Sequence, residues 1–329
     1  MAHGSGGRAM AQLIDELFLA CLGNDFLRQR NDAALLPIHG GQLVVSTDAH
    51  VVSPLFFPGG DIGSLSVNGS INDVAVLGAK PLYLAASFIL EEGLAFADLA
   101  QIVESMADAS TTAGVPVVTG DTKVVQRGKG DGVFITTTAI GVLTDGPAYS
   151  GDRARPGDSV IVSGTIAEHG MAIIAERHGM HFATPMLSDT APLHGLVQHM
   201  RTSGADIHTL RDPTRGGVAT TLNEIAQQSK VGILLHEEAL PVQPPVAAAC
   251  EFLGLDPLYV ANEGKLLAIV APEDADLLLA AMRAHPLGRR AAIIGTVRAD
   301  SRHFVQALTM LGGRRIVDWL AGEPLPRIC

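Results

Sequence analysis

Hydrophobic residues recur at helical spacing in two segments of the first half of the chain. They share one face near residues 10–21 and again near 96–107, which predicts two amphipathic helices. Short runs rich in β-branched and other apolar residues predict strands. These runs cover residues 43–47, 82–90, 115–119 and 133–143. The first half is therefore expected to be a mixed sheet with helices.

A polar stretch at residues 150–158 contains proline and glycine and stands directly before a new apolar run at 160–163. Such a stretch is typical of a domain boundary, so we expect one domain over 1–150 and a second over 151–321. In the second domain, apolar runs alternate with helical patterns, as in a separate α/β layer structure. The runs cover 231–235, 266–270 and 291–297, and the helical patterns lie near 168–178, 216–228 and 273–284.

The segment 322–329 is predicted to be a mobile tail. Pro324 and Pro326 prevent a helix there, and the segment offers no partner for the interior of a sheet. Its last residue is Cys329. An extended tail of this kind reaches about 25 Å, so its thiol could be delivered into a cleft. The alternative is an inert, disordered end, and the sequence leaves open whether the tail rests inside a cleft or outside it.

The composition agrees with a large α/β protein: 329 residues, 47% of them hydrophobic and 17% charged, suffice for two domains with real cores. The 23 Lys and Arg against 34 Asp and Glu form no basic stripe, which argues against duplex nucleic acid as a partner. No run approaches the roughly 18 apolar residues that span a bilayer, and the start lacks the apolar region of a signal peptide. We therefore expect a cytoplasmic protein with no membrane partner.

Acidic residues of the first half stand in contexts that read as strand ends or turns: Asp32, Asp48, Asp73 and Asp121. Two of them, Asp48 and Asp121, each close a predicted strand, where a sheet edge opens into a cleft. Gathered carboxylates suit Mg²⁺, which takes few protein oxygens and fills its other positions with water and nucleotide phosphates. The alternative is that these residues simply favour turns and caps.

The glycine-rich start, from His3 to Arg8, opens a predicted helix, so its backbone amides could hold phosphate oxygens. It matches a dinucleotide-binding fingerprint, but too few residues precede it for a strand, so a Rossmann site is disfavoured. Asp212 precedes a glycine pair and a helix, as a cap or a metal ligand. Glu263 stands in a turn before a predicted strand, where a solvated side chain and a general base are both consistent with the sequence.

Histidines crowd the second half without the spacing of metal ligands, so a transition-metal site is disfavoured; they are His169, His178, His181, His194, His199 and His208. The cysteines, Cys21, Cys250 and Cys329, are too few and too scattered for a disulfide framework. Cys21 and Cys250 fall on apolar helical patterns and are expected in the core. Cys329 remains as a candidate covalent handle.

Taken together, several motifs resemble the HypE family of hydrogenase maturation factors, and the match runs from end to end. The family belongs to the superfamily of aminoimidazole ribonucleotide synthetase, selenophosphate synthetase and thiamine-monophosphate kinase. The acidic motifs are shared across that superfamily, whereas the Pro-Arg-Ile-Cys ending is specific to HypE. The motifs are His3-Gly-Ser-Gly-Gly7, the stretch from Thr47 to Gly63, Ser70-Ile-Asn-Asp73, Gly120-Asp-Thr-Lys123, Arg211-Asp-Pro-Thr-Arg-Gly-Gly217, Ala261-Asn-Glu-Gly-Lys265 and Pro326-Arg-Ile-Cys329.

The resemblance implies an ATP-dependent dehydratase that acts on its own C-terminal cysteine. The carbamoyltransferase HypF places a carbamoyl group on that cysteine, which becomes a thiocyanate, and the cyanide passes through a HypC–HypD scaffold to the iron of a nickel-iron hydrogenase. The implied fold is a two-domain α/β (α+β) structure. Its N-terminal mixed sheet binds ATP and forms a barrel in a homodimer, and its C-terminal domain is also α/β.

The resemblance also assigns roles to residues. Cys329 carries the carbon, and Lys123 and Glu263 orient and deprotonate the nitrogen, in an order that the sequence does not determine. The positions that match Mg²⁺ ligands are Asp32, Asp48, Asp73, Asp121 and Asp212. The positions that match ATP contacts are His3, Gly4, Gly6, Gly7, Thr47, Asn72, Asp73 and Asp121.

Two features depart from the family pattern. The chain starts almost at the His3 motif, where relatives usually carry several more residues, and Asn31 stands where the superfamily often has a first Asp. Other functions stay open: an ATP-dependent small-molecule kinase or synthetase of the same superfamily, or a non-catalytic scaffold that presents its tail to partners. A terminal cysteine would have no use in a thiamine-phosphate kinase.

Overall fold

The structure is a computed structural model that describes residues 8, 11, 28, 34–38, 40–180, 182, 184–320, 322 and 327–329. The first half forms a five-stranded sheet in the order β1-β2-β7-β5-β6, in which only the β5–β6 pair is parallel. A short hairpin, β3–β4, lies beside it. The elements are β1 (Ala34–Ile38), β2 (Gly41–His50), β3 (Phe56–Phe57), β4 (Gly60–Asp61), α3 (Ile62–Val76), β5 (Lys80–Glu91), α4 (Phe96–Ala113), β6 (Val117–Val125) and β7 (Val133–Leu143).

The second half forms a seven-stranded sheet in the order β14-β13-β10-β12-β8-β11-β9. Helix α7 packs on one face of this sheet, and α6 and α9 pack on the other, so both faces are covered. The elements are β8 (Ser159–Val162), α5 (Glu168–Arg177), α6 (His194–Thr202), β9 (Ile207–Arg211), α7 (Gly217–Ser229), β10 (Gly232–His236), α8 (Pro244–Leu253), β11 (Leu267–Val270), α9 (Ala275–Ala284), β12 (Ala292–Arg298), β13 (Val305–Leu308) and β14 (Arg314–Ile316). Short 3₁₀ turns lie at Glu237–Ala239, Pro257–Tyr259, Pro272–Asp274 and Pro286–Gly288.

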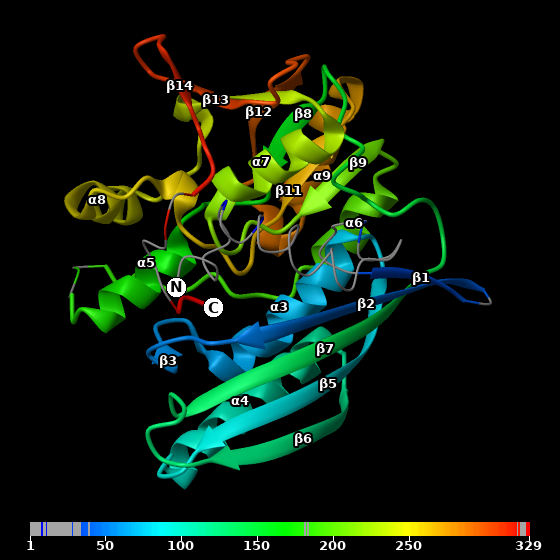
Figure 1. The fold of residues 1–329 in the computed structure, drawn as a ribbon. Coiled ribbons are helices and arrows are strands. Elements are labelled where there is room, and N and C mark those ends of the chain that lie inside the picture. The colour runs from blue at the N-terminus through cyan, green and yellow to red at the C-terminus, as the bar shows by residue number, and fades with distance from the viewer. Residues whose placement is uncertain are drawn as a thin grey trace.

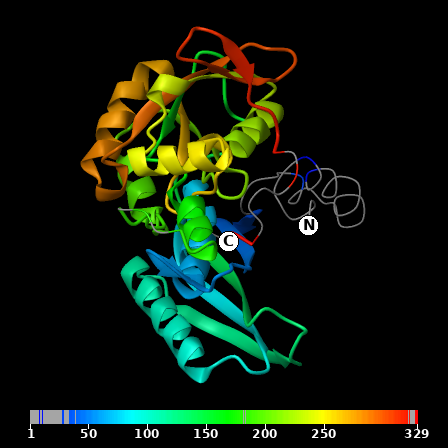
Figure 2. The ribbon, with the colours of Figure 1, turned by 90° about the vertical axis from the view of Figure 1, so that its left-hand side faces the viewer.

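Helix α3 lies between the two halves (Figures 1 and 2). It contacts β2, β7 and α4 in the first half and α6 and β9 in the second. Its N-terminus is closed by a capping box, in which the Asp61 carboxylate accepts from Ser64 N at 2.9 Å and Ser64 Oγ accepts from Asp61 N at 3.1 Å. At Gly63, any β-carbon would lie 2.2 Å from a backbone oxygen of α4, so only glycine permits the close crossing of these helices.

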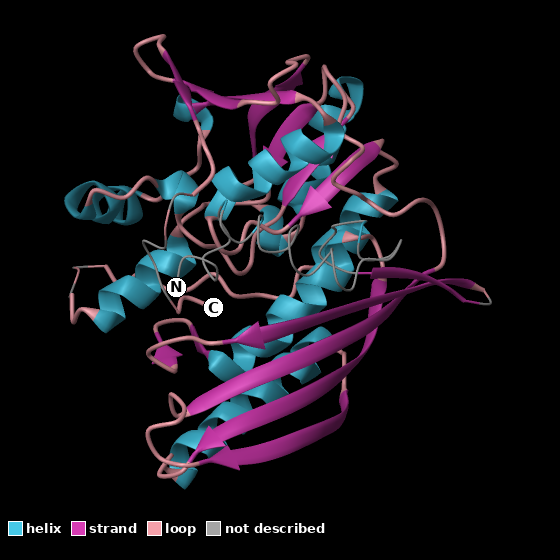
Figure 3. Ribbon diagram, in the orientation of Figure 1, coloured by secondary structure: helices cyan, strands magenta, loops and turns pink. Residues whose placement is uncertain are grey.

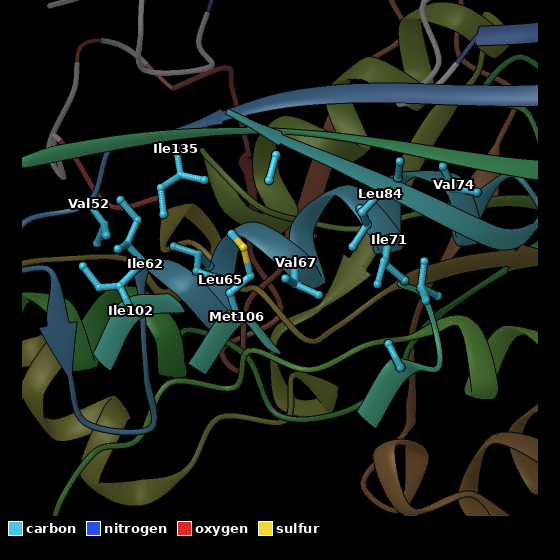
Figure 4. Packing of buried hydrophobic residues seen from close by; sticks show 14 of the residues in the cluster. Val52, Ile62, Leu65, Val67, Ile71, Val74, Leu84, Ile102, Met106 and Ile135 are labelled. Carbon is cyan, nitrogen blue, oxygen red and sulfur yellow. The ribbon is translucent and has the colours of Figure 1, made fainter. Parts of the chain in front are cut away.

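The core of the first half gathers around α3. Figure 4 shows Leu65, Val67 and Ile71 of this helix packed among side chains of β5, β7 and α4. Because α3 is buried on almost every side, its apolar residues do not follow a single stripe. That burial explains why periodicity alone predicts no helix over these residues.

Several predicted elements are confirmed, including β7, α5 and α9, and Figure 3 shows the mixture of helices and strands that the α/β prediction requires. Other predictions are wrong. Asn72 and Asp73 lie inside a helix rather than at a strand end or turn. Asp48 and Asp121 lie within β2 and β6 rather than at the ends of these strands. The sequence pattern also misses α6 and β9. The predicted helix near 10–21, with Cys21, lies outside the described residues.

Strand β6 is the edge of the first sheet, and most of its residues are exposed. Val118 and Val124 are more than half exposed, at 56% and 68%. An unpaired edge strand with apolar side chains is a site where another chain can add to the sheet. None of the described helices is long and apolar enough to cross a membrane.

Candidate active site

The last residues of the sequence lie between the two halves, close to α5 and β3 (Figure 1). Val51 N donates to Cys329 O at 3.1 Å and Ser53 N donates to Arg327 O at 3.2 Å, so the end of the chain pairs antiparallel with the segment that follows β2. Ile328 is 3% exposed and joins the core of the first half. Residues 327–329 therefore lie against the chain beyond β2 without joining a sheet, which answers the question that the sequence left open about where the end of the chain rests.

The Glu263 carboxyl group lies close enough to the Cys329 thiol to raise the pKa of that thiol. The backbone of Glu263 is fixed on both sides: its N–H donates to Asp189 Oδ1 at 3.0 Å, and its carbonyl accepts from Asn72 Nδ2 at 3.2 Å. Gly264 follows because a β-carbon there would lie 1.8 Å from Asp189 O. The turn that the sequence predicts before β11 thus holds a buried carboxyl group and not a solvated one.

Burial is the main cause that raises the pKa of Glu263 well above its ordinary value, and the carboxylates of Asp48, Asp189 and Asp212 raise it further. Burial also raises the pKa of the Cys329 thiol well above its ordinary value, with a further contribution from Glu263. Arg215 opposes both shifts. The surroundings therefore favour the uncharged form of both the thiol and the carboxyl group.

Three predicted metal ligands lie on different elements, and two of them, Asp48 and Asp212, act on the Glu263 carboxyl group. Asp48 lies on β2, Asp73 lies on α3 and accepts from Ser46 Oγ at 2.5 Å, and Asp212 lies just before α7. Among the described residues, no group of three or more His, Cys, Asp or Glu side chains lies close enough together to coordinate a metal ion. Separate hard oxygen donors without a complete cage fit Mg²⁺, because this ion takes part of its coordination from water and phosphate oxygens.

His50 is a site residue that the sequence analysis missed. Its Nε2 lies 3.5 Å from Asp48 Oδ2, and burial lowers the pKa of His50 although Asp48 opposes that shift. His50 Nδ1 and Glu263 Oε1 are both buried without a hydrogen-bond partner. The sequence could have indicated His50 through its position two residues after Asp48, because alternate residues of a strand lie on the same face of the sheet.

Asp121 and Lys123 lie elsewhere in this chain. Lys123 Nζ donates to both Asp121 carboxylate oxygens, at 2.7 and 2.6 Å, on the exposed strand β6. This ion pair lowers the pKa of Asp121. The sheet register places β7 and β5 between Asp48 and this pair. At about 4.8 Å per strand, roughly 14 Å separate them, so one chain alone does not bring Lys123 to Cys329.

Besides Asn72, the remaining predicted nucleotide contacts are Thr47 and residues of the glycine-rich start, and of these only Thr47 lies among the described residues. Thr47 is on β2, where its Oγ1 donates to Thr137 O at 3.2 Å. The others lie outside the described residues, as does the predicted metal ligand Asp32; they are His3, Gly4, Gly6 and Gly7.

Asn72 has a structural task in addition to any ligand contact. Its side chain donates to Ala191 O and Glu263 O at 3.0 and 3.2 Å and accepts from Leu193 N at 2.7 Å. It therefore ties α3 to the segment that carries Glu263.

Replacing Asn72 with alanine should lower the free energy of unfolding by about 2–4 kcal/mol, because the change leaves three buried backbone groups without partners. Denaturant titration measures this loss. The matched control is Asn68→Ala on the same helix, where one hydrogen bond of 3.3 Å to Thr190 is lost and about 1 kcal/mol is expected. Equal losses in the two variants would refute the structural role of Asn72.

Comparison with known proteins places this geometry among relatives. Residues 30–143 match the family described as AIR synthase related protein, N-terminal domain. Residues 155–307 match the AIR synthase related protein, C-terminal domain. A carbamoyl dehydratase HypE of Cupriavidus necator is 65% identical, in an alignment that covers 100% of this chain and 94% of the relative.

Solved structures give the same picture. A HypE–HypF complex contains a chain that is 49% identical, with a TM-score of 0.89, covering 94% of this chain and 99% of that one. A HypE structure in complex with ATP is 50% identical, with a TM-score of 0.85, covering 99% of this chain and 98% of that one. The similarity thus extends over both halves and the segment between them.

Proposed function

The chain belongs to the HypE family of the AIR synthase-related proteins, and from this membership we propose that it is an ATP-dependent carbamoyl dehydratase. The substrate is an S-carbamoyl group on its own Cys329, and the product is the S-cyanate. The observation that carries the proposal is the docking of Cys329 beside the Glu263 carboxyl group, with the Asp48 carboxylate acting on both groups.

The reaction requires that the carbamoyl oxygen leave and that the nitrogen lose both protons. Bound ATP with Mg²⁺ supplies a phosphoryl group, which turns the amide oxygen into a phosphate leaving group. The carbon–oxygen bond then breaks, the nitrogen lone pairs form the triple bond, and the net products are S-cyanate, ADP, phosphate and a proton. The Glu263 carboxyl group lies next to Cys329, which would carry the carbamoyl carbon. In its ionised form Glu263 accepts a proton from the carbamoyl nitrogen.

The chain's own residues also suit the nucleotide. Asp48, Asp73 and Asp212 would hold Mg²⁺, with Asp32 as a further predicted ligand. Asp121 is too far from Asp48 to join them within one chain and could contribute only from a second copy. The charge of Arg215 acts on both Cys329 and Glu263 and is placed to offset negative charge that develops on the transferred oxygen.

We propose that the carbamoyl group comes from HypF and that the cyanide passes on through a HypC–HypD scaffold to a nickel-iron hydrogenase. The solved HypE–HypF complex supports the first of these partners. A homodimer that pairs strand β6 of one copy with the β1 edge of the other copy's sheet would bring Lys123 of a second copy toward Asp48 and Glu263. Lys123 would then act across the dimer and not within one chain.

The test is mass spectrometry of the peptide that ends in Cys329. Protein carbamoylated by its transferase and given Mg-ATP should lose one water from Cys329, and the loss should require ATP. The control is Cys329→Ala, which should accept no carbamoyl group while unfolding at the same temperature as the wild type. A carbamoyl adduct that persists while ATP is bound would refute the dehydratase and favour the scaffold.

A further inference from the structure

The last three residues are held through their main chain, and each of their carbonyl groups has a partner. Arg327 O accepts from Ser53 N and, at 2.9 Å, from Arg177 Nη2. Ile328 O lies 2.7 Å from His169 Nε2, and Cys329 O accepts from Val51 N. Consecutive carbonyls in an extended chain point in alternate directions, so partners on both sides fix the rotation of the segment about its axis.

His169 is fully buried on α5, and three contacts determine its orientation. The edge of the Phe57 ring meets its ring at a centroid distance of 5.5 Å and an angle of 89°. Ser188 Oγ lies 2.8 Å from Nδ1. Because the Ile328 carbonyl can only accept, Nε2 must carry the proton, and burial lowers the pKa of His169 so that the ring stays neutral. Nδ1 therefore accepts from the Ser188 hydroxyl, and one tautomer is selected.

Arg177 stands at the last turn of the same helix and joins two backbone segments. Its Nε and Nη2 donate to Ser53 O at 2.9 and 2.6 Å, and Nη2 also donates to Arg327 O. The side chain of Ile328 fills a gap in the core of the first half, and Arg327 forms an ion pair with Asp131. Most of these contacts are hydrogen bonds to the backbone of residues 327–329. The side chains of Ile328 and Arg327 add one contact each.

We propose that His169 and Arg177 form a main-chain receptor for residues 327–329, and that they are positioning residues that set Cys329 against Glu263. The catalytic part of this proposal rests on the proposed function, whereas the seating of the tail does not. Displacing a reacting group by about 1 Å lowers the reaction rate strongly. His169 and Arg177 bind the carbonyl groups of Ile328 and Arg327, so they would set the position of the Cys329 sulfur, and with it the rate, without contacting the reacting atoms.

The first experiment measures tail seating without catalysis. The full-length protein is treated with iodoacetamide, and the alkylation rate of Cys329 is read by peptide mapping, which separates it from Cys21 and Cys250. Arg177→Ala and His169→Ala should each raise the Cys329 rate about tenfold or more, the effect of losing a buried or charge-assisted hydrogen bond. His178→Ala, an exposed neighbour at the end of α5, should leave the rate unchanged.

Conservative variants separate positioning from folding. His169→Gln retains an N–H donor near the position of Nε2 and should restore most of the slow alkylation. Arg177 is only half-buried, so Arg177→Ala should unfold at the wild-type temperature. Alkylation rates of Arg177→Ala and His169→Ala equal to the wild-type rate would overturn the receptor. Equal rates in His169→Ala and His169→Gln would overturn the assigned donor.

The second experiment uses the S-carbamoyl protein in single turnover with Mg-ATP. Both alanine variants should lower the maximal rate of water loss about tenfold and leave the ATP concentration at half-maximal rate unchanged, because neither residue lies among the predicted ATP contacts. A change confined to the ATP dependence would overturn the positioning role. If no protein dehydrates, the wild type included, the proposed function fails while the alkylation result still decides the receptor.

Discussion

Replacing Glu263 with glutamine should lower the single-turnover rate of S-carbamoyl dehydration at least about a hundredfold, the usual effect of removing a general base. Glutamine keeps the size and burial of the side chain but cannot accept a proton. The S-carbamoyl form should still accumulate, because loading of Cys329 does not require Glu263. The control is Glu273→Gln, an exposed position beyond the other end of β11, which should retain the wild-type rate.

The pH dependence follows from the raised pKa of Glu263. A raised pKa means that the base form appears only at a pH well above the ordinary carboxyl range, so the wild-type rate should climb with pH through that region. Glu263→Gln should lack this rise. A rate that is independent of pH in the wild type, or an unchanged slope in the variant, would show that another group takes the proton.

The same substitution should not weaken the fold. A carboxyl group with a raised pKa in the folded state favours folding fully below its unfolded pKa, and this contribution is lost as pH rises through the folded pKa. Glutamine does not titrate, so the stability of Glu263→Gln relative to the wild type should increase as pH rises above the ordinary carboxyl pKa. Denaturant titration at several pH values measures this trend, and a variant that becomes relatively less stable with pH would contradict the assignment.

Mixing Lys123→Ala with Glu263→Gln should restore activity that neither variant has alone. If Lys123 acts across the dimer, a mixed dimer contains one site with Lys123 from one copy and Glu263 from the other. Random exchange of two chains then yields about a quarter of the wild-type sites. The measurement is ATP-dependent water loss after the two variants have been exchanged and loaded.

The control mixture is Glu263→Gln with Cys329→Ala, which should stay inactive because Cys329 and Glu263 meet within one chain. Activity in this control would mean that the tail serves the neighbouring copy. Absence of activity in the Lys123 mixture, with exchange verified, would place Lys123 within its own chain's site. Full activity of Lys123→Ala alone would place Lys123 outside the chemistry.

Sequence patterns predict several strands of this fold, including the buried strands β8 and β11, but not helix α3 at its centre. Strand β7 alternates buried and less buried residues, which is the pattern that periodicity detects, and its predicted bounds are confirmed. Helix α3 is missed because contacts on almost every side remove the polar face that would mark it. Burial thus hides the element that links the halves.

The site shows the same division. The residue types of the Asp48 and Glu263 motifs indicate the chemistry, but their meeting depends on hydrogen bonds between distant segments, such as that from Asn72 to the Glu263 carbonyl. Residues His169 and Arg177 belong to no motif that the sequence analysis singled out. Their role rests on where the tail lies, and no local pattern encodes that position.

The docked position of the half-buried Cys329 also bears on its exposure to oxidants. Peroxides and other oxidants attack the thiolate, and the raised pKa of the docked thiol keeps it in the protonated form. An exposed cysteine on a free tail would be open to sulfenic acid formation and to mixed disulfides with glutathione. The docked arrangement therefore protects this sulfur from oxidation, and under the proposed function it would keep the sulfur available for carbamoylation.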